Sequence, residues 1–135
     1  MHDLAPIIFI CYNRYDHVVR SLKSLRKNKL SKKSKIIIFA DAPTDQINKK
    51  KTDKIKIYLK KLNGFKSKKI IFRKKNLGTK QNIVNAVSQV LKKFNKVIVI
   101  EDDLLLSKFF LDYMNLCLKK YKDEKKIWHI NGWSY

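Results

Sequence analysis

Three consecutive carboxylates, Glu101, Asp102 and Asp103, are the side chains whose types and spacing most clearly suit chemistry. They directly follow residues 97–100, an apolar, β-branched run typical of a buried strand. Like charges this close raise one another's pKa unless a cation neutralises them, and carboxylate oxygens suit Mg²⁺ or Mn²⁺. The run therefore predicts a divalent-metal site, with Asp103 as the preferred direct ligand and Asp102 beside it. An acidic helix N-cap is the alternative, and it explains one carboxylate rather than three.

Polar side chains also follow the other apolar runs of the chain. Tyr12, Asn13 and Arg14 follow the first run, and Asp41 follows the second. Arg14 opens a predicted helix, where the helix dipole disfavours a cation, so we expect it to reach an anion or a base. The alternative for Arg14 is a surface ion pair with Asp16 or Asp41.

The position of Asp41 suits a hydrogen bond from a uracil-like imide or from a ribose hydroxyl. The alternative for Asp41 is a turn-forming role before a helix. Asn76 and Gly78 follow the third run, where Gly78 would let the backbone approach a phosphate. This segment lacks the glycine spacing of a P-loop, so a loop capped by Asn76 or Thr79 is its alternative.

Four apolar runs predict strands, and stripes with helical spacing lie between them. The strands are predicted at residues 7–12, 35–40, 69–73 and 96–100. The helices are predicted at residues 16–27, from 44 or 45 to the Asn63-Gly64 pair, along the 83–94 stripe, and along the 110–121 stripe with Ser107 as N-cap. A last short strand is predicted at residues 127–131.

This alternation predicts one α/β domain over residues 1–135, with a doubly wound, mostly parallel sheet between helical layers, α/β/α. Ligands of such sheets bind at the carboxyl ends of the strands, and the polar residues above collect at that edge. The two cysteines predict a reduced protein without disulfides. Because the first strand begins so near Met1, we expect no signal peptide and a cytoplasmic protein.

The net charge of +21 comes mostly from lysine, since only four of the 32 basic residues are arginines. Base-specific nucleic-acid readers favour arginine forks and aromatic platforms, so a specific nucleic-acid partner is not expected. The simplest interpretation is solvated lysine faces with weak affinity for polyanions. The positive charge would also suit peripheral binding to anionic lipids at the inner face of the membrane.

These motifs resemble the GT-A fold glycosyltransferases, in particular the N-acetylglucosaminyltransferase I type, with a family 2-like pattern. The resemblance rests on the Tyr12-Asn13-Arg14 turn, on Asp41, on the acidic run leading into Leu104 and paired phenylalanines, and on the tryptophan-bearing segment 128–134. It implies a Rossmann-like fold and a UDP-sugar donor whose diphosphate Mn²⁺ or Mg²⁺ bridges to Asp103.

The resemblance also implies roles for the remaining candidates. Arg14 and Asp41 would hold the nucleoside, Glu101 and Asp102 would lie near the ribose or the sugar, and the metal would stabilise the departing diphosphate. Asn82 falls where relatives have a histidine near the base. Tyr12, Asn13 and Asn76 complete the expected nucleotide-sugar site.

Relatives continue into an acceptor-binding half that supplies the catalytic base, so we expect this chain to lack that half and its base. The complete enzyme would transfer a sugar to a saccharide acceptor. The alternative is a non-catalytic basic module that binds nucleotide or nucleic acid in a salt-sensitive, metal-independent way. An uncovered sheet edge would also favour self-association.

Overall fold

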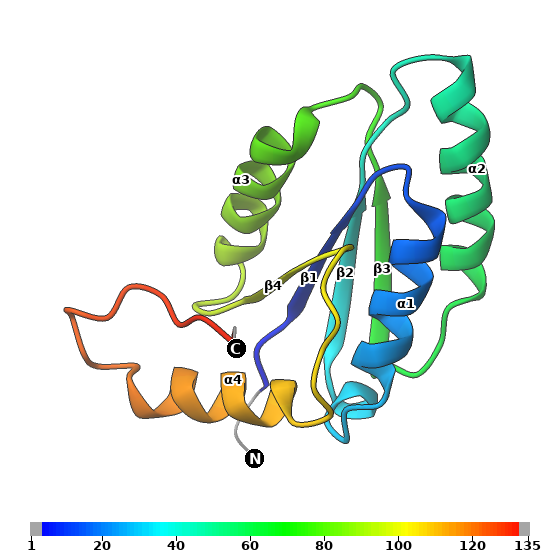
Figure 1. Ribbon diagram of the computed structural model, residues 1–135. Coiled ribbons are helices and arrows are strands. Elements are labelled where there is room, and N and C mark those ends of the chain that lie inside the picture. Colours follow the sequence, from blue (N-terminus) through cyan, green and yellow to red (C-terminus); the bar gives the residue numbers. More distant parts are fainter. Residues whose placement is uncertain (1–3, 133–135) are drawn as a thin grey trace.

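The computed structural model describes residues 4–132 and is organised around one parallel sheet (Figure 1). Its strands are β1 (Ile7–Cys11), β2 (Lys35–Ala40), β3 (Ser67–Phe72) and β4 (Ile98–Glu101), in the order β3-β2-β1-β4. The helices are α1 (Tyr15–Arg26), α2 (Gln46–Lys61), α3 (Gly78–Leu91) and α4 (Phe110–Lys120), with a short 3₁₀ helix at Ser31–Lys33. The predicted α/β class is confirmed.

The central strand β1 is buried along its whole length because it is covered on both faces. Its alternate residues Ile7, Phe9 and Cys11 enter one apolar cluster, while Ile8 and Ile10 enter a second cluster on the opposite face. Successive side chains of a strand point to opposite faces, so both parities must be apolar here. This is why the run is continuous rather than alternating in sequence.

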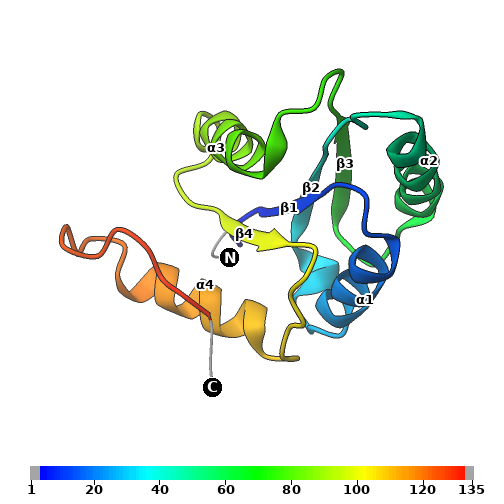
Figure 2. The ribbon, with the colours of Figure 1, turned by 45° about the horizontal axis from the view of Figure 1, so that its top comes forward.

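The helices divide between the two faces as right-handed crossovers require (Figure 2). The chain steps from β1 to β2 to β3 through α1 and α2, whose Leu22 and Ile55 pack into the first cluster. It then returns across the sheet through α3, whose Ala86 and Val90 pack into the second cluster. The strand order therefore reverses between β1 and β4, and a crevice at their carboxyl ends is the expected ligand position.

Beyond β4 the chain runs back beside α1 before it forms α4 (Figure 1). The Leu106 amide donates to Ser24 Oγ at 3.1 Å, and the Leu111 amide donates to the buried Asn28 Oδ1 at 2.9 Å. Leu111 and Met114 then extend the first apolar cluster. These contacts fix the segment that follows the acidic run.

Two sequence predictions are wrong. Residues 127–131 form no strand among the described residues, because no neighbouring strand pairs with them and the Ile127 amide bonds the Glu124 carbonyl in a turn. Ser107 is not the N-cap of α4, which begins after Phe109, although Ser107 Oγ accepts from the Phe109 amide at 3.2 Å. The predicted motif residues 133 and 134 lie outside the described part of the chain. None of the described helices combines the length and apolarity that crossing a bilayer requires.

Candidate functional site

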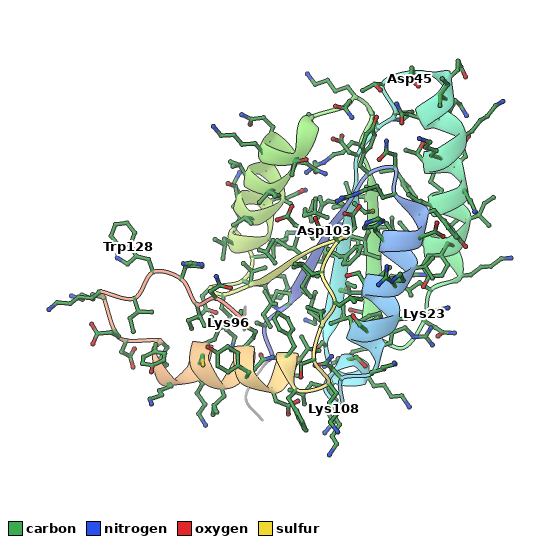
Figure 3. The ribbon with its side chains drawn as sticks, viewed as in Figure 1. Lys23, Asp45, Lys96, Asp103, Lys108 and Trp128 are labelled. Carbon is green, nitrogen blue, oxygen red and sulfur yellow. The ribbon has the colours of Figure 1, made fainter. Side chains whose placement is uncertain are left out.

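A cavity of about 400 Å³ opens at the carboxyl ends of the strands, at the crevice between β1 and β4. Eight of the nine predicted site residues line it, namely Tyr12, Asn13, Arg14, Asp41, Asn76, Asn82, Glu101 and Asp102. Asp103, the preferred metal ligand, does not line the cavity and lies beside it with about half of its side chain exposed, at the end of β4 (Figure 3). The structure thus brings together residues from five separate segments of the sequence.

Asp102 is the buried carboxylate of the acidic run. Its Oδ1 accepts from Arg14 Nη2 at 2.5 Å, and its carboxylate also accepts from the Tyr12 amide. Burial raises the pKa of the Asp102 carboxyl above its ordinary value, and the neighbouring Arg14 only partly opposes that rise. The Asp102 side chain is therefore protonated more readily than an aspartate in water.

Arg14 precedes α1 and spans the acidic run, with Nη2 also 3.5 Å from Asp103 Oδ2. Burial lowers the pKa of Arg14, but Asp102 and Asp103 more than offset this and leave the pKa above its ordinary value. Asp102 is the buried partner and Arg14 is half exposed, so the desolvation of the Asp102 carboxylate decides the net effect of this ion pair on stability.

Asp41 joins the end of β2 to the start of α3. Its Oδ1 accepts from the amides of Ala42 and Leu77, and its Oδ2 accepts from the amide of Gly78, each at 2.9 Å. Gly78 has a φ of 71°, which favours glycine, and a Cβ there would meet nothing within 4 Å. Asp41 therefore braces the loop before α3 rather than a turn before α2, and it lines the cavity as well.

The α3 side of the cavity is held by amide side chains. Asn76 Nδ2 donates to the Ala42 carbonyl at 2.7 Å, and Asn76 Oδ1 accepts from the Gly78 amide at 3.2 Å. Asn82 is buried in α3, where its Oδ1 accepts from Arg73 Nε at 3.0 Å. Both amides are thus partly engaged by the protein. The N-cap of α3 is Leu77, so neither Asn76 nor Thr79 is the cap that the sequence suggested, although Asn76 accepts from the first amide of the helix.

Arg73 is a residue that the sequence interpretation missed. Its guanidinium lies 4.9 Å from the centre of the Phe39 ring, and its Nη2 is buried with no hydrogen-bond partner among the described residues. Burial lowers the pKa of Arg73, and the nearby Asp41 opposes this. A signal was available, because Arg73 is one of only four arginines and directly follows β3, at the ligand-binding edge of the sheet.

A second set of contacts that the sequence did not predict connects the Tyr12–Asn13 loop to the start of α2. Asn13 Nδ2 donates to Asn48 Oδ1 at 2.7 Å, and the Tyr12 hydroxyl lies 3.1 Å from Thr44 Oγ1. Asp45 caps α2 by accepting from the Asn48 amide at 2.8 Å. Only the cap carries a sequence signal, since the other contacts join residues more than 30 positions apart.

The carboxylates fit a metal that is held jointly with a bound ligand rather than by a complete protein cage. Among residues 4–132 no group of three or more histidine, cysteine or acidic side chains is placed to hold a metal ion. Asp102 is engaged by Arg14, whereas Asp103 and Glu101 are exposed. Magnesium-type ions commonly take one or two carboxylates and complete their octahedron with phosphate oxygens and water. The donor set is compatible with that mode.

Comparisons with known proteins agree with this architecture. The model of the GNT-I family matches residues 1–135. The structure is similar to that of S. aureus TarS, with a TM-score of 0.64 and 19% identity, over 88% of this chain and 20% of that chain. It is also similar to S. aureus TarS 1-349 in complex with UDP, with a TM-score of 0.61 and 22% identity, over 88% of this chain and 33% of that chain.

At these identities the two structures show a shared fold. This chain spans between a fifth and a third of their length. Among curated proteins, no sequence matches this chain.

Proposed function

Because the chain belongs to the GNT-I family, we propose that its cavity binds the nucleotide-sugar donor of a glycosyltransferase. Membership of the family confirms the resemblance seen in the sequence. The observation that carries the proposal is the convergence of eight predicted polar residues on one cavity of about 400 Å³ at the reversal of strand order. This volume lies within the usual range of small-molecule sites. The UDP bound to the TarS fragment supports a uridine nucleotide as the ligand.

The nucleoside is proposed to lie on the β2–α3 side of the cavity. Asp41 Oδ2 accepts one protein hydrogen bond and retains a lone pair for a uracil imide or a ribose hydroxyl. Asn82 offers a further amide contact from the floor of the cavity. Its bond from Arg73 fixes the orientation of the amide, so this contact would be selective for one edge of the base.

The diphosphate is proposed to lie on the β1–β4 side, near Arg14 and the acidic run. Asp103 would hold Mn²⁺ or Mg²⁺, supported by Glu101, and the metal would supply Lewis-acid stabilisation of the departing diphosphate. Arg14 is half exposed and reaches both Asp102 and Asp103. Its guanidinium is therefore placed to turn from Asp103 toward a phosphate while it keeps its bond to Asp102.

The acceptor and the cellular site belong to the proposal as well. We expect a saccharide acceptor, bound outside the donor cavity, and we assign the catalytic base to none of the residues that line this cavity. We also expect a cytoplasmic location and self-association through the uncovered apolar surface, which includes Leu105, Leu116 and Trp128. Light scattering of the purified chain tests the last expectation, and a monomer at high concentration would contradict it.

Calorimetric titration of UDP into the chain tests the donor site. We expect binding with Mn²⁺, loss of binding with EDTA, and loss in an Asp103→Ala variant. Asp112→Ala removes an acidic residue in the first turn of α4, outside the cavity lining, and should bind UDP as the original chain does. Binding that ignores the metal and Asp103 but collapses with salt would instead favour a basic polyanion-binding module.

A further inference from the structure

The helix α2 carries an unusual outer face that the donor site does not explain. Ile47, Lys50, Lys54, Ile57 and Lys61 recur every three or four residues and are all exposed. The opposite side of the helix packs Thr52, Ile55 and Leu59 into the molecule. We call the first set the α2 outer face. Ile47 is 71% exposed and Ile57 is 60% exposed, so two large apolar side chains stand in water among lysines.

The charge of α2 is almost entirely positive. The helix has seven lysines in 16 residues, and these are Lys49, Lys50, Lys51, Lys54, Lys56, Lys60 and Lys61. Its one carboxylate, Asp53, is paired with Lys49 at 2.7 Å and with Lys56 at 3.7 Å. The other lysines therefore have no acidic partner within the helix. Such a density of like charge costs stability unless an anionic surface neutralises it.

We propose that the α2 outer face docks the protein onto an anionic lipid surface, with Ile47 and Ile57 entering the headgroup region. Helices that bind a membrane interface gain from apolar side chains that enter the headgroup boundary and from lysines that are attracted to anionic lipids. Lysine stems can lie along the apolar surface while their ammonium groups reach lipid phosphates. The arrangement here has both features.

The composition of the α2 outer face favours lipid over nucleic acid. The helix contains no arginine, and its one aromatic residue, Tyr58, packs edge-on against Tyr15 with ring centres 6.0 Å apart. Isoleucine cannot stack on a base or hydrogen-bond to one, whereas RNA recognition depends on such contacts. The boundary between lipid headgroups and acyl chains can bury the two isoleucines, whereas a polynucleotide offers no apolar layer to them.

Docking through α2 would also place the proposed donor site next to the membrane. Asp45 and Asn48 lie where α2 begins, at the same edge as the cavity, and Asn48 bonds Asn13 of the cavity lining. Figure 3 shows Asp45 at this end of α2. A helix that lies along the surface thus leaves the cavity opening close to the lipid headgroups.

Flotation of the whole chain with lipid vesicles tests this proposal. We expect binding to vesicles of phosphatidylglycerol and phosphatidylcholine, weak binding to pure phosphatidylcholine, and a loss of binding at high salt. A Lys50→Gln/Lys54→Gln/Lys61→Gln variant, which removes the three lysines of the α2 outer face, should bind roughly a hundredfold more weakly, at about fivefold per lysine. An Ile47→Ser/Ile57→Ser variant should bind about tenfold more weakly at unchanged charge.

The matched control is Lys92→Gln/Lys93→Gln/Lys119→Gln, which removes the same charge from exposed lysines at the ends of α3 and α4. It should retain most of the affinity for vesicles. An equal loss in this control would overturn the proposal, as would no binding of the original chain to anionic vesicles. If the α2 lysine variant loses binding to an RNA oligonucleotide as well as to vesicles, and the isoleucine variant binds vesicles as the original chain does, the α2 outer face is a polyanion-binding surface instead. Unchanged UDP binding in every variant would show that the donor site is separate.

Discussion

Replacing Asp41 by asparagine should destabilise the fold, because its carboxylate holds the loop between β3 and α3. Asparagine keeps one oxygen, so it can retain the two bonds from Ala42 and Leu77. Its amide nitrogen would then face the Gly78 amide, and one donor would oppose another. A hydrogen bond to a charged group contributes about 1.5–3 kcal/mol, so we expect a loss of about 2 kcal/mol.

The loss should be visible in thermal unfolding followed by circular dichroism. For a chain of this length, 1 kcal/mol corresponds to about 3–5 °C, so Asp41→Asn should melt about 6–10 °C lower. Asp41→Ala removes all three bonds and should melt lower still. Asp45→Ala is the matched control, because it removes an exposed carboxylate that caps α2, and its effect should be smaller.

The same variants separate the two roles of Asp41. If Asp41→Asn melts within about 2 °C of the original chain and yet loses UDP binding, Asp41 serves the ligand and not the loop. That outcome would refute the structural reasoning. A lower melting temperature with weakened UDP binding is the result that we expect.

Three further predictions concern groups around the site. Because burial raises the pKa of Asp102, its negative charge costs stability at neutral pH, so Asp102→Asn should melt at a higher temperature than the original chain at pH 7. The difference should vanish as the pH falls to about 4, the ordinary pKa of an aspartate; a lower melting temperature at pH 7 would contradict this. Burial raises the pKa of the Cys11 thiol, so iodoacetamide at pH 8 should leave it unmodified in the native chain and label it only in denaturant, as peptide mass spectrometry can show. Asn48→Ala removes the partner of Asn13 and should weaken UDP binding about fivefold in calorimetry, whereas an unchanged affinity would exclude this positioning role.

The sheet and its ligand edge follow from the sequence because they depend on local pattern. Residues 7–11 are apolar at every position, which only a doubly covered strand explains, and the polar residues after each strand must then share one edge. The prediction of a strand at residues 127–131 is wrong because strand formation there depends on a distant partner and not on local pattern. A strand depends on a partner, and no local pattern reveals that none is present among the described residues.

Within the site, residue types were predictable but partners were not. The sequence indicates that Arg14 seeks an anion, whereas the pairing with Asp102 joins residues 88 positions apart and needs the packed fold. Likewise, Asp41 signals a turn, but its bonds to Leu77 and Gly78 depend on where α3 begins. Arg73 was not predicted as a site residue because it is one of 32 basic residues, although its position directly after β3 indicates the ligand-binding edge of the sheet.

The most direct test of the central claim is chemical-shift mapping of UDP with Mg²⁺ on the isotopically labelled chain. The proposal predicts that backbone amides near residues 10–14, 41–42, 76–82 and 101–103 shift together, with one shared dissociation constant. Shifts concentrated on the lysines of α2, or the absence of saturable shifts at millimolar UDP in a folded sample, would contradict the assignment of this cavity as the donor site.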